Sequence, residues 1–333
     1  MRTLFLLCCL SLVACATTAS VPVPASAGSS ALHEVKRVKV AENVELEVLD
    51  FGGRGPALVF LPGLGDTGHV FDTFAPEFTA AHHVYSVTRR GFGSSSWPEQ
   101  GYDTATLGED VVRVLDGLGL AKASFVGHSA AGPELTWVAT HHPERVEKVV
   151  YLDVRTDGDL LAELLTVLPM PPPSEPAPED VASRAAVAAA AARHVGGALP
   201  EHEIDETSEF DPNTGRYLRD HEWPHAEERV MKGFLKVDFA AVRAPVLFFS
   251  AGEPPPRPQR AEDIPGFPQM TPPQQETLRT LVPRKLERDA EMERVLSMPN
   301  WKGVKLEHAR HYLWLTHHDE VLREMMTFLG TSS

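Results

Sequence analysis

A serine at position 129 is the residue of this chain best placed for nucleophilic chemistry. It lies in the string Gly127-His128-Ser129-Ala130-Ala131-Gly132, after the apolar run Ala123 to Val126 and before a predicted helix from Pro133 to Thr140. A sharp turn between a strand and a helix exposes a serine hydroxyl, and small neighbours let the backbone turn tightly. Alanine stands at the fifth position of the usual Gly-x-Ser-x-Gly string and glycine follows one place later, so the string needs support from its context.

That context comes from elements at both ends of the chain. The apolar runs Ala57 to Phe60 and Val84 to Val87 each end at a glycine-containing turn. Near the C-terminus a short strand, Gly303 to Leu306, precedes a histidine-containing loop and a helix from about Asp319 to Leu329. Strands that alternate with helices predict a mainly parallel sheet with helices on both faces, an α/β fold.

Together these features resemble an α/β-hydrolase, with matches in the family's chain order from about residue 44 to residue 330. The resemblance implies Ser129 as nucleophile and His311 as its base, since His311 falls after the last strand and before the last helix. His308 is the local alternative. The resemblance also implies an oxyanion hole made by the backbone amides of Leu64 and Ala130, since such donors stabilise the negative charge that develops in acyl transfer.

An acid is expected to orient the histidine, and two residues compete for that role. Asp153 ends the predicted strand Lys148 to Leu152, where strand ends supply reacting groups. Glu253 follows the strand Pro245 to Ser250, close to the family's usual place, but one or two residues early. Asp153 is the preferred member and Glu253 the alternative.

A serine nucleophile indicates a different reaction from the carboxylate nucleophile of haloalkane dehalogenases and epoxide hydrolases. It favours hydrolysis of a carboxylic ester or a related small acyl substrate, such as a thioester, lactone or amide, or cleavage of a carbon–carbon bond beside a ketone. Two alternatives stay open. One is a non-catalytic binding protein of the same fold; the other is a peptidase resembling proline iminopeptidases, with Glu203, Glu206 or Glu209 binding the peptide amine.

Charge and histidine spacing narrow the expected ligands. The formal net charge of −15 disfavours nucleic acid and anionic lipid as partners, and mildly disfavours strongly anionic substrates. The histidine pairs His82-His83, His141-His142 and His317-His318 have no second ligand cluster at the spacing of zinc sites. The sequence therefore predicts no cofactor and no metal, and it leaves the oligomeric state open.

The first residues predict export. Met1-Arg2 is followed by an apolar stretch, Thr3 to Val13, and Leu12-Val13-Ala14-Cys15 resembles a bacterial lipoprotein processing box. Residues 1–14 are thus expected to be a signal peptide and Cys15 to carry lipid, with residues 15–31 as a flexible tether and a plain secretory signal as the alternative. All three cysteines lie in this region, so the core needs no disulfide.

The remaining chain divides into a core of residues 32–153 and 241–333 and a cap of residues 154–240. Within the cap, Gly158 to Leu168 and Val181 to His194 are predicted helices, and a further helix is predicted from Gln274 to Leu296. The side chains expected to line the pocket or the cap's core are Leu160, Leu161, Leu164, Phe210, Tyr217 and Trp223.

Overall fold

The computed structural model describes residues 32–168, 176–221, 225–252 and 258–330. The predictions for the signal peptide, the tether, Cys15, Trp223 and Glu253 lie outside the described residues. No helix in the described ranges is long and apolar enough to cross a membrane.

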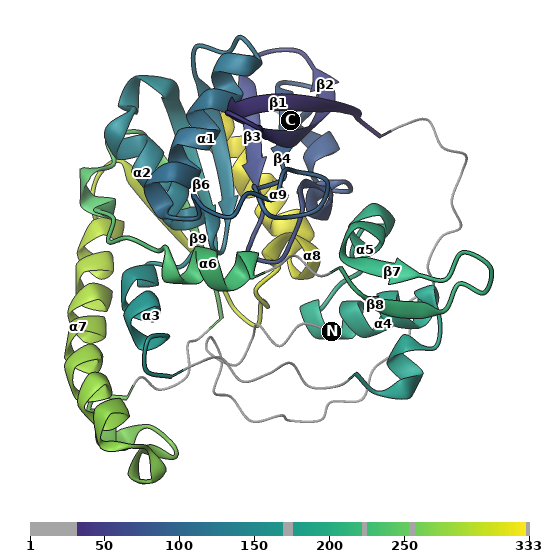
Figure 1. Ribbon diagram of the computed structural model, residues 1–333. Coiled ribbons are helices and arrows are strands. Elements are labelled where there is room, and N and C mark those ends of the chain that lie inside the picture. Colours follow the sequence, from purple (N-terminus) through teal and green to yellow (C-terminus); the bar gives the residue numbers. More distant parts are fainter. Residues whose placement is uncertain (1–31, 169–175, 222–224, 253–257, 331–333) are drawn as a thin grey trace.

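An eight-stranded sheet forms the centre of the core (Figure 1). Its order is β1-β2-β4-β3-β5-β6-β9-β10. The pairs β1·β2 and β2·β4 are antiparallel, and every other pair is parallel. The strands are β1 (Glu34–Ala41), β2 (Val44–Gly53), β3 (Ala57–Leu61), β4 (His83–Val87), β5 (Ala123–His128), β6 (Val146–Leu152), β9 (Val246–Ala251) and β10 (Trp301–Leu306). The predicted α/β class is confirmed.

Alternate residues of the central strands enter two separate apolar layers, as the two-residue period of a strand requires. Phe125 and Tyr151 pack in a cluster with Leu135, which belongs to helix α2 (Ala131–His141). Val126 and Val150 pack on the other face with Trp314, of α8 (Leu313–Thr316). Helix α1 (Thr104–Gly117) joins α2 on the first face, and α9 (His318–Leu329) joins α8 on the second. Burial on both faces explains why these strands are continuous apolar runs.

Between β6 and β9 the chain forms a cap of short elements. They are α3 (Gly158–Leu164), η4 (Pro178–Val181), α4 (Arg184–Val195), α5 (Glu201–Thr207), β7 (Ser208–Phe210), β8 (Tyr217–Asp220) and α6 (Ala226–Lys232). Figure 1 shows α4, α5 and the β7–β8 hairpin grouped together, apart from the long helix α7 (Pro272–Leu296).

Helix boundaries in and around the cap differ from the predicted ones. The helix expected from Gly158 to Leu168 ends at Leu164. The helix expected from Val181 begins at Arg184 because the Ser183 hydroxyl caps it, accepting a hydrogen bond from the amide of Ala186. The helix expected to begin at Gln274 begins two residues earlier: α7 starts at Pro272, and Thr271 is its N-cap residue.

Candidate active site

The carboxyl ends of adjacent parallel strands place two predicted site residues side by side. Ser129 follows β5 and Asp153 follows β6, and both have positive φ, 52° and 47°. Non-glycine residues occupy this region at a cost, so the surrounding structure must hold them there. The Ser129 amide donates to the carbonyl of Leu152 at 3.1 Å, and the Asp153 amide donates to that of Phe249 at 3.0 Å. Each turn is therefore fixed by the next strand of the sheet.

The turn at Ser129 explains the shifted glycine of the elbow string. A Cβ on Gly132 would lie 2.5 Å from the Cβ of Val154, so helix α2 can pack here only without a side chain at position 132. The Cβ of Ala131 is accommodated, because Gly127 leaves room beside it. A Cβ added at Gly127 would meet Leu135 at 2.6 Å and that of Ala131 at 3.3 Å. The departure from the usual string is thus compatible with a tight strand-to-helix turn.

His311 reaches the same edge from the loop after β10. Its Nδ1 lies 2.6 Å from Oδ2 of Asp153, and the second carboxylate oxygen accepts a hydrogen bond from the amide of Ala251 at 2.9 Å. Burial disfavours the charged carboxylate, but the hydrogen bond from His311 and the other donors outweigh it and lower the pKa of Asp153. Because an ionised carboxylate can only accept, Nδ1 carries the hydrogen and Nε2 is able to take a proton.

Ser129 and His311 line one cavity of about 190 Å³. The predicted oxyanion residues, Leu64 and Ala130, line it as well. The structure therefore brings Ser129, His311, Leu64 and Ala130 together, with Asp153 behind the histidine; their catalytic roles stay predictions. His308, the alternative base, is exposed and is not among the described lining residues.

A buried arginine fixes the loop that carries Leu64. Arg89 donates to the carbonyls of Pro62 and Gly63 at 3.0 and 3.1 Å, and its Nε donates to Glu134 at 2.6 Å. Glu134 lies in the first turn of α2, directly after the serine turn. The Arg89–Glu134 pair thus links the loop after β3 to the helix that follows Ser129. The sequence analysis did not single out this link, although Arg89 directly precedes the string Arg90-Gly91-Phe92-Gly93-Ser94 after β4.

His128, next to the serine, is a buried histidine. Its Nε2 donates to the backbone carbonyl of His311 at 3.1 Å, and its ring contacts those of Tyr312 and Trp314. Burial, with the neighbouring His311, lowers the pKa of His128. Tyr312 in turn donates to Asp66 at 2.9 Å. These contacts hold the loop of His311 against the strand that ends at Ser129.

The cap forms the opposite wall of the cavity. Of the predicted lining residues, Leu161 and Tyr217 face it. Leu160 is buried, Leu164 packs beside the apolar cluster at α7, and Phe210 contacts the ring of Tyr217, but these three are not among the described lining residues.

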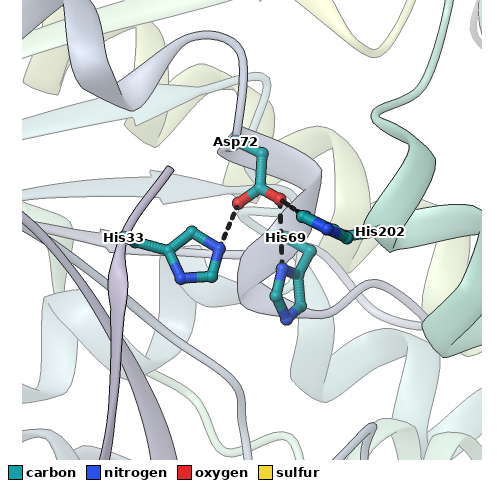
Figure 2. A group of neighbouring side chains, drawn as sticks. All are labelled: His33, His69, Asp72 and His202. Carbon is teal, nitrogen blue, oxygen red and sulfur yellow. Dashed lines mark hydrogen bonds and ion pairs between the residues drawn. The ribbon is translucent and has the colours of Figure 1, made fainter. Parts of the chain in front are cut away.

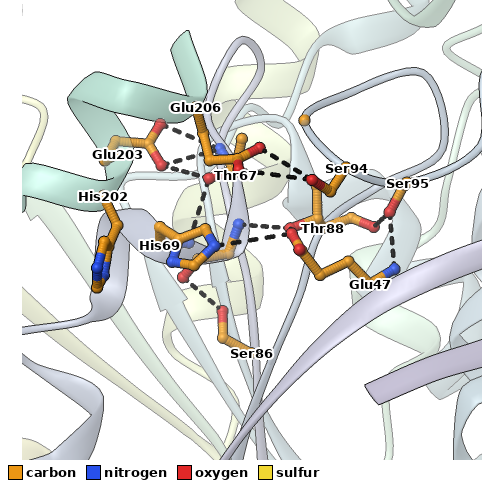
Figure 3. Close-up of polar contacts among 12 residues, drawn as sticks. Glu47, Thr67, His69, Ser86, Thr88, Ser94, Ser95, His202, Glu203 and Glu206 are labelled. Atoms are coloured by element: carbon orange, nitrogen blue, oxygen red, sulfur yellow. Dashed lines mark hydrogen bonds and ion pairs between the residues drawn. The ribbon is translucent and has the colours of Figure 1, made fainter. Parts of the chain in front are cut away.

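The three cap glutamates that the peptidase alternative requires as amine-binding groups occupy different places. Glu203 lines the cavity and accepts a hydrogen bond from the amide of Thr67 at 3.1 Å. Burial and the nearby Asp66 raise the pKa of Glu203 well above its ordinary value. Glu206 accepts from the hydroxyl of Ser94, as Figure 3 shows, and Glu209 pairs with Arg219 on the hairpin. Only Glu203 among these three therefore faces the cavity.

The structure also brings together a group that the sequence analysis missed. His33, His69, Asp72 and His202 present their ring nitrogens and carboxylate oxygens to one another. No spacing along the chain revealed this group, because three separate segments contribute to it. Its local signal was the pair His69 and Asp72, three residues apart on one helical turn.

Comparison with known proteins agrees with this architecture. The sequence pattern of the alpha/beta hydrolase fold family matches residues 56–237, more than half of the chain. The chain is 34% identical over 116 residues to 3-oxoadipate enol-lactonase 2 of Acinetobacter baylyi, which covers 34% of this chain and 43% of that protein. It is 31% identical over 138 residues to bifunctional epoxide hydrolase 2 of Rattus norvegicus, covering 40% of this chain and 24% of the relative.

Among solved structures, E-2-(acetamidomethylene)succinate hydrolase superposes with a TM-score of 0.62 at 18% identity, covering 90% of this chain and all of that one. At this identity the likeness concerns the fold alone. The curated relatives are matched over less than half of their length. The sequence pattern, the sheet order and the positions of the strand-end residues together show that this chain belongs to the α/β-hydrolase fold family.

Proposed function

We propose that this protein is a serine hydrolase that cleaves a carboxylic ester or lactone through an acyl-enzyme on Ser129. The observation that carries the proposal is the 2.6 Å contact between His311 Nδ1 and Asp153 Oδ2, with Ser129 and His311 on one cavity. In this mechanism His311 Nε2 takes the serine proton as the hydroxyl attacks the acyl carbon. Asp153 stabilises the imidazolium that results.

The tetrahedral intermediate would be stabilised by the amides of Leu64 and Ala130. When it collapses, His311 gives its proton to the leaving alcohol, and the acyl group stays on Ser129. Water, deprotonated by His311, then attacks the acyl-enzyme, and when this second intermediate collapses His311 returns the proton to the Ser129 oxygen and the acid is released. Arg89 supports this step indirectly by holding the loop before Leu64 through the carbonyls of Pro62 and Gly63.

The lining of the cavity favours an uncharged substrate. Asp66, Asp180 and Asp220 line it, and Arg155 is the only arginine or lysine among the described lining residues. Arg155 is itself paired with Asp157 at 2.9 Å. Apolar residues from the cap, such as Leu161, Ile204 and Phe234, contribute much of the remaining wall. We therefore expect a neutral acyl group of modest size rather than a dicarboxylate.

Labelling by a fluorophosphonate tests the nucleophile. We expect wild-type protein to be labelled and to turn over short acyl esters, and Ser129→Ala to do neither. Ser124→Ala, which removes a buried serine from the same strand, is the matched control and should keep both activities. A wild type that neither labels nor hydrolyses any ester or lactone would favour the binding-protein alternative. Turnover of amino-acid amides without turnover of esters would favour the peptidase.

We further propose that the protein is exported and carries lipid on Cys15, on the strength of the lipoprotein-like string in the sequence. Growth with labelled palmitate should label the wild type and not Cys15→Ser. Absence of label on the wild type would contradict lipidation.

A further inference from the structure

Four metal-ligating side chains from three segments meet where the cap touches the core. His33 lies just before β1, His69 lies in the short helix η1 (Gly68–Phe71), Asp72 follows it directly, and His202 lies in α5. Figure 2 shows the three imidazoles arranged around the Asp72 carboxylate. One ligand atom from each residue lies within 4.8 Å of all the others.

The separations between the Asp72 carboxylate oxygens and the three ring nitrogens are close to those of a tetrahedral zinc site. Oδ2 of Asp72 lies 3.1 Å from Nδ1 of His69 and 2.9 Å from Nδ1 of His202, and Oδ1 lies 3.4 Å from Nε2 of His33. Around Zn²⁺, with ligands at about 2.0–2.1 Å, neighbouring donor atoms are about 3.3 Å apart. Small side-chain shifts would therefore suffice to bring all four groups to one ion. Three imidazoles and a carboxylate are ligands that zinc favours.

Without a bound ion, the cluster leaves buried polar atoms that form no hydrogen bond. The side chains of Asp72 and His33 are 1% and 7% exposed. Within the described part of the chain, Nδ1 of His33 has no hydrogen-bond partner, and Nε2 of His33 and Oδ1 of Asp72 meet at 3.4 Å as an ion pair but form no hydrogen bond. Buried polar atoms without partners are costly and rare, and each one calls for an explanation. A cation between the four residues would engage Asp72 Oδ1 and Nε2 of His33 together.

A second carboxylate stands behind one of the ligands. Nε2 of His69 faces Oε2 of Glu47 at 3.8 Å, and that oxygen is fixed by the hydroxyl of Thr88 at 2.9 Å (Figure 3). Carboxylates behind metal-ligating imidazoles orient the ring and make it a better ligand. His69 therefore has Nδ1 directed at the cluster and Glu47 opposite its Nε2, as expected for a histidine that ligates a metal.

The cluster is separate from the proposed catalytic site but joined to its wall. None of the four residues is among the described residues that line the cavity. The next residue after His202, however, is Glu203, which lines the cavity and is bonded to Thr67 of the core. We propose that His33, His69, Asp72 and His202 bind one Zn²⁺ ion, which ties cap helix α5 to the core and so fixes this wall of the cavity.

Zinc content and thermal stability test the site directly, without reference to catalysis. Tag-free full-length protein is stripped with a chelator, loaded with ZnCl2, passed through a desalting column and analysed for bound metal. We expect one zinc per chain. At a free zinc concentration about a hundredfold above Kd, the melting temperature should rise by about 5 °C.

His202→Asn and His33→Asn each remove one ligand and should weaken zinc binding by about a hundredfold or more. His83→Asn is the matched control, because His83 also pairs with a carboxylate, Asp50 at 2.8 Å, but lies outside the cluster; it should bind zinc as the wild type does. His202 is largely exposed, with 53% of its side chain accessible, so its variant should fold and decides the matter if His33→Asn does not.

A wild type that holds no zinc above the buffer blank overturns the proposal. Zinc retained equally by the wild type and His202→Asn overturns it as well, because the ion would then lie elsewhere. Loss in a folded His202→Asn together with full retention in a folded His33→Asn would refute the four-ligand site.

Discussion

Asp153, at the end of β6, can be tested by replacing its carboxylate with an amide of the same size. Asp153→Asn keeps the size of the side chain but removes the acceptor that holds the hydrogen on His311 Nδ1. We expect kcat for an ester to fall by about four orders of magnitude, as in serine hydrolases whose acid is made an amide. Asp116→Asn, an exposed carboxylate paired with Arg145, should leave kcat unchanged. A loss smaller than tenfold would make Asp153 a structural residue and return Glu253 to consideration.

The buried His128 should make stability depend on pH. Its pKa is lowered in the folded state, so the unfolded chain binds a proton near pH 6.5 that the folded chain does not. The neutral His128 therefore contributes its full share to the free energy of unfolding above pH 6.5. This contribution is lost as the pH falls toward and through the lowered pKa of the folded state, by up to about 1.4 kcal/mol for each pH unit.

We expect His128→Asn to be less stable than the wild type at pH 8, and the difference between them to narrow at pH 5.5. Urea unfolding at the two pH values measures this. His141→Asn, at the exposed end of α2, should show a difference that does not vary in this way. An equal wild-type advantage at both pH values would mean that folding does not shift the pKa of His128.

At the residue scale, the sequence carried enough information to place Ser129, Asp153 and His311 together, because each follows a strand of one parallel sheet and such strands end at a common edge. It could not place His33, His69, Asp72 and His202 together. Their meeting depends on how the cap packs onto the core, and no local pattern encodes that packing.

At the scale of elements, the contact between Gly132 and Val154 tests why the elbow differs from the usual string. Gly132→Ala should destabilise the fold by about 1–3 kcal/mol, since its Cβ would meet that of Val154 at 2.5 Å. Val154→Ala in the same chain should recover part of the loss, whereas Ala131→Gly should cost no more than about 1 kcal/mol. Unfolding of the single and double variants measures the coupling. Purely additive effects would show that the close contact is not what requires glycine at position 132.

The Arg89 link should control the rate through the loop that it holds. Lysine cannot contact Glu134 and the carbonyls of Pro62 and Gly63 together, so Arg89→Lys should lower kcat by about tenfold to a hundredfold with little change in KM. Arg90→Lys is the matched control, because Arg90 is equally buried but pairs with Asp110 and does not touch that loop. If both variants lose the same activity, the effect of Arg89 is one of general stability.

The parallel strands and helix α2 could be predicted closely, because buried apolar runs ended by glycine turns mark them, whereas β1 and β2 were not predicted. The strand expected from Ala57 to Phe60, for example, became β3 with one added residue. The cap was less predictable. Its alanine-rich and proline-rich segments have weak periodicity, and capping by Ser183 set the start of α4 instead.

At the scale of the whole molecule, the negative net charge should favour neutral over anionic substrates. The chain carries a formal charge of −15, and the cavity is lined by several carboxyl groups, with the cation of Arg155 already paired. A negatively charged ester is therefore repelled both at long range and at the mouth of the cavity.

At low salt, kcat/KM for monomethyl succinate, which is an anion, should be at least about tenfold lower than kcat/KM for the neutral dimethyl succinate. Because the Debye length shrinks from about 10 Å at 0.1 M salt to about 3 Å at 1 M, added salt should raise kcat/KM for the anion and leave that of the neutral ester nearly constant. Steady-state kinetics on the two esters across this salt range measures both effects. Faster hydrolysis of the anion at low salt, with a decline as salt is added, would instead reveal an attractive cationic subsite and would reverse the proposed preference for neutral acyl groups.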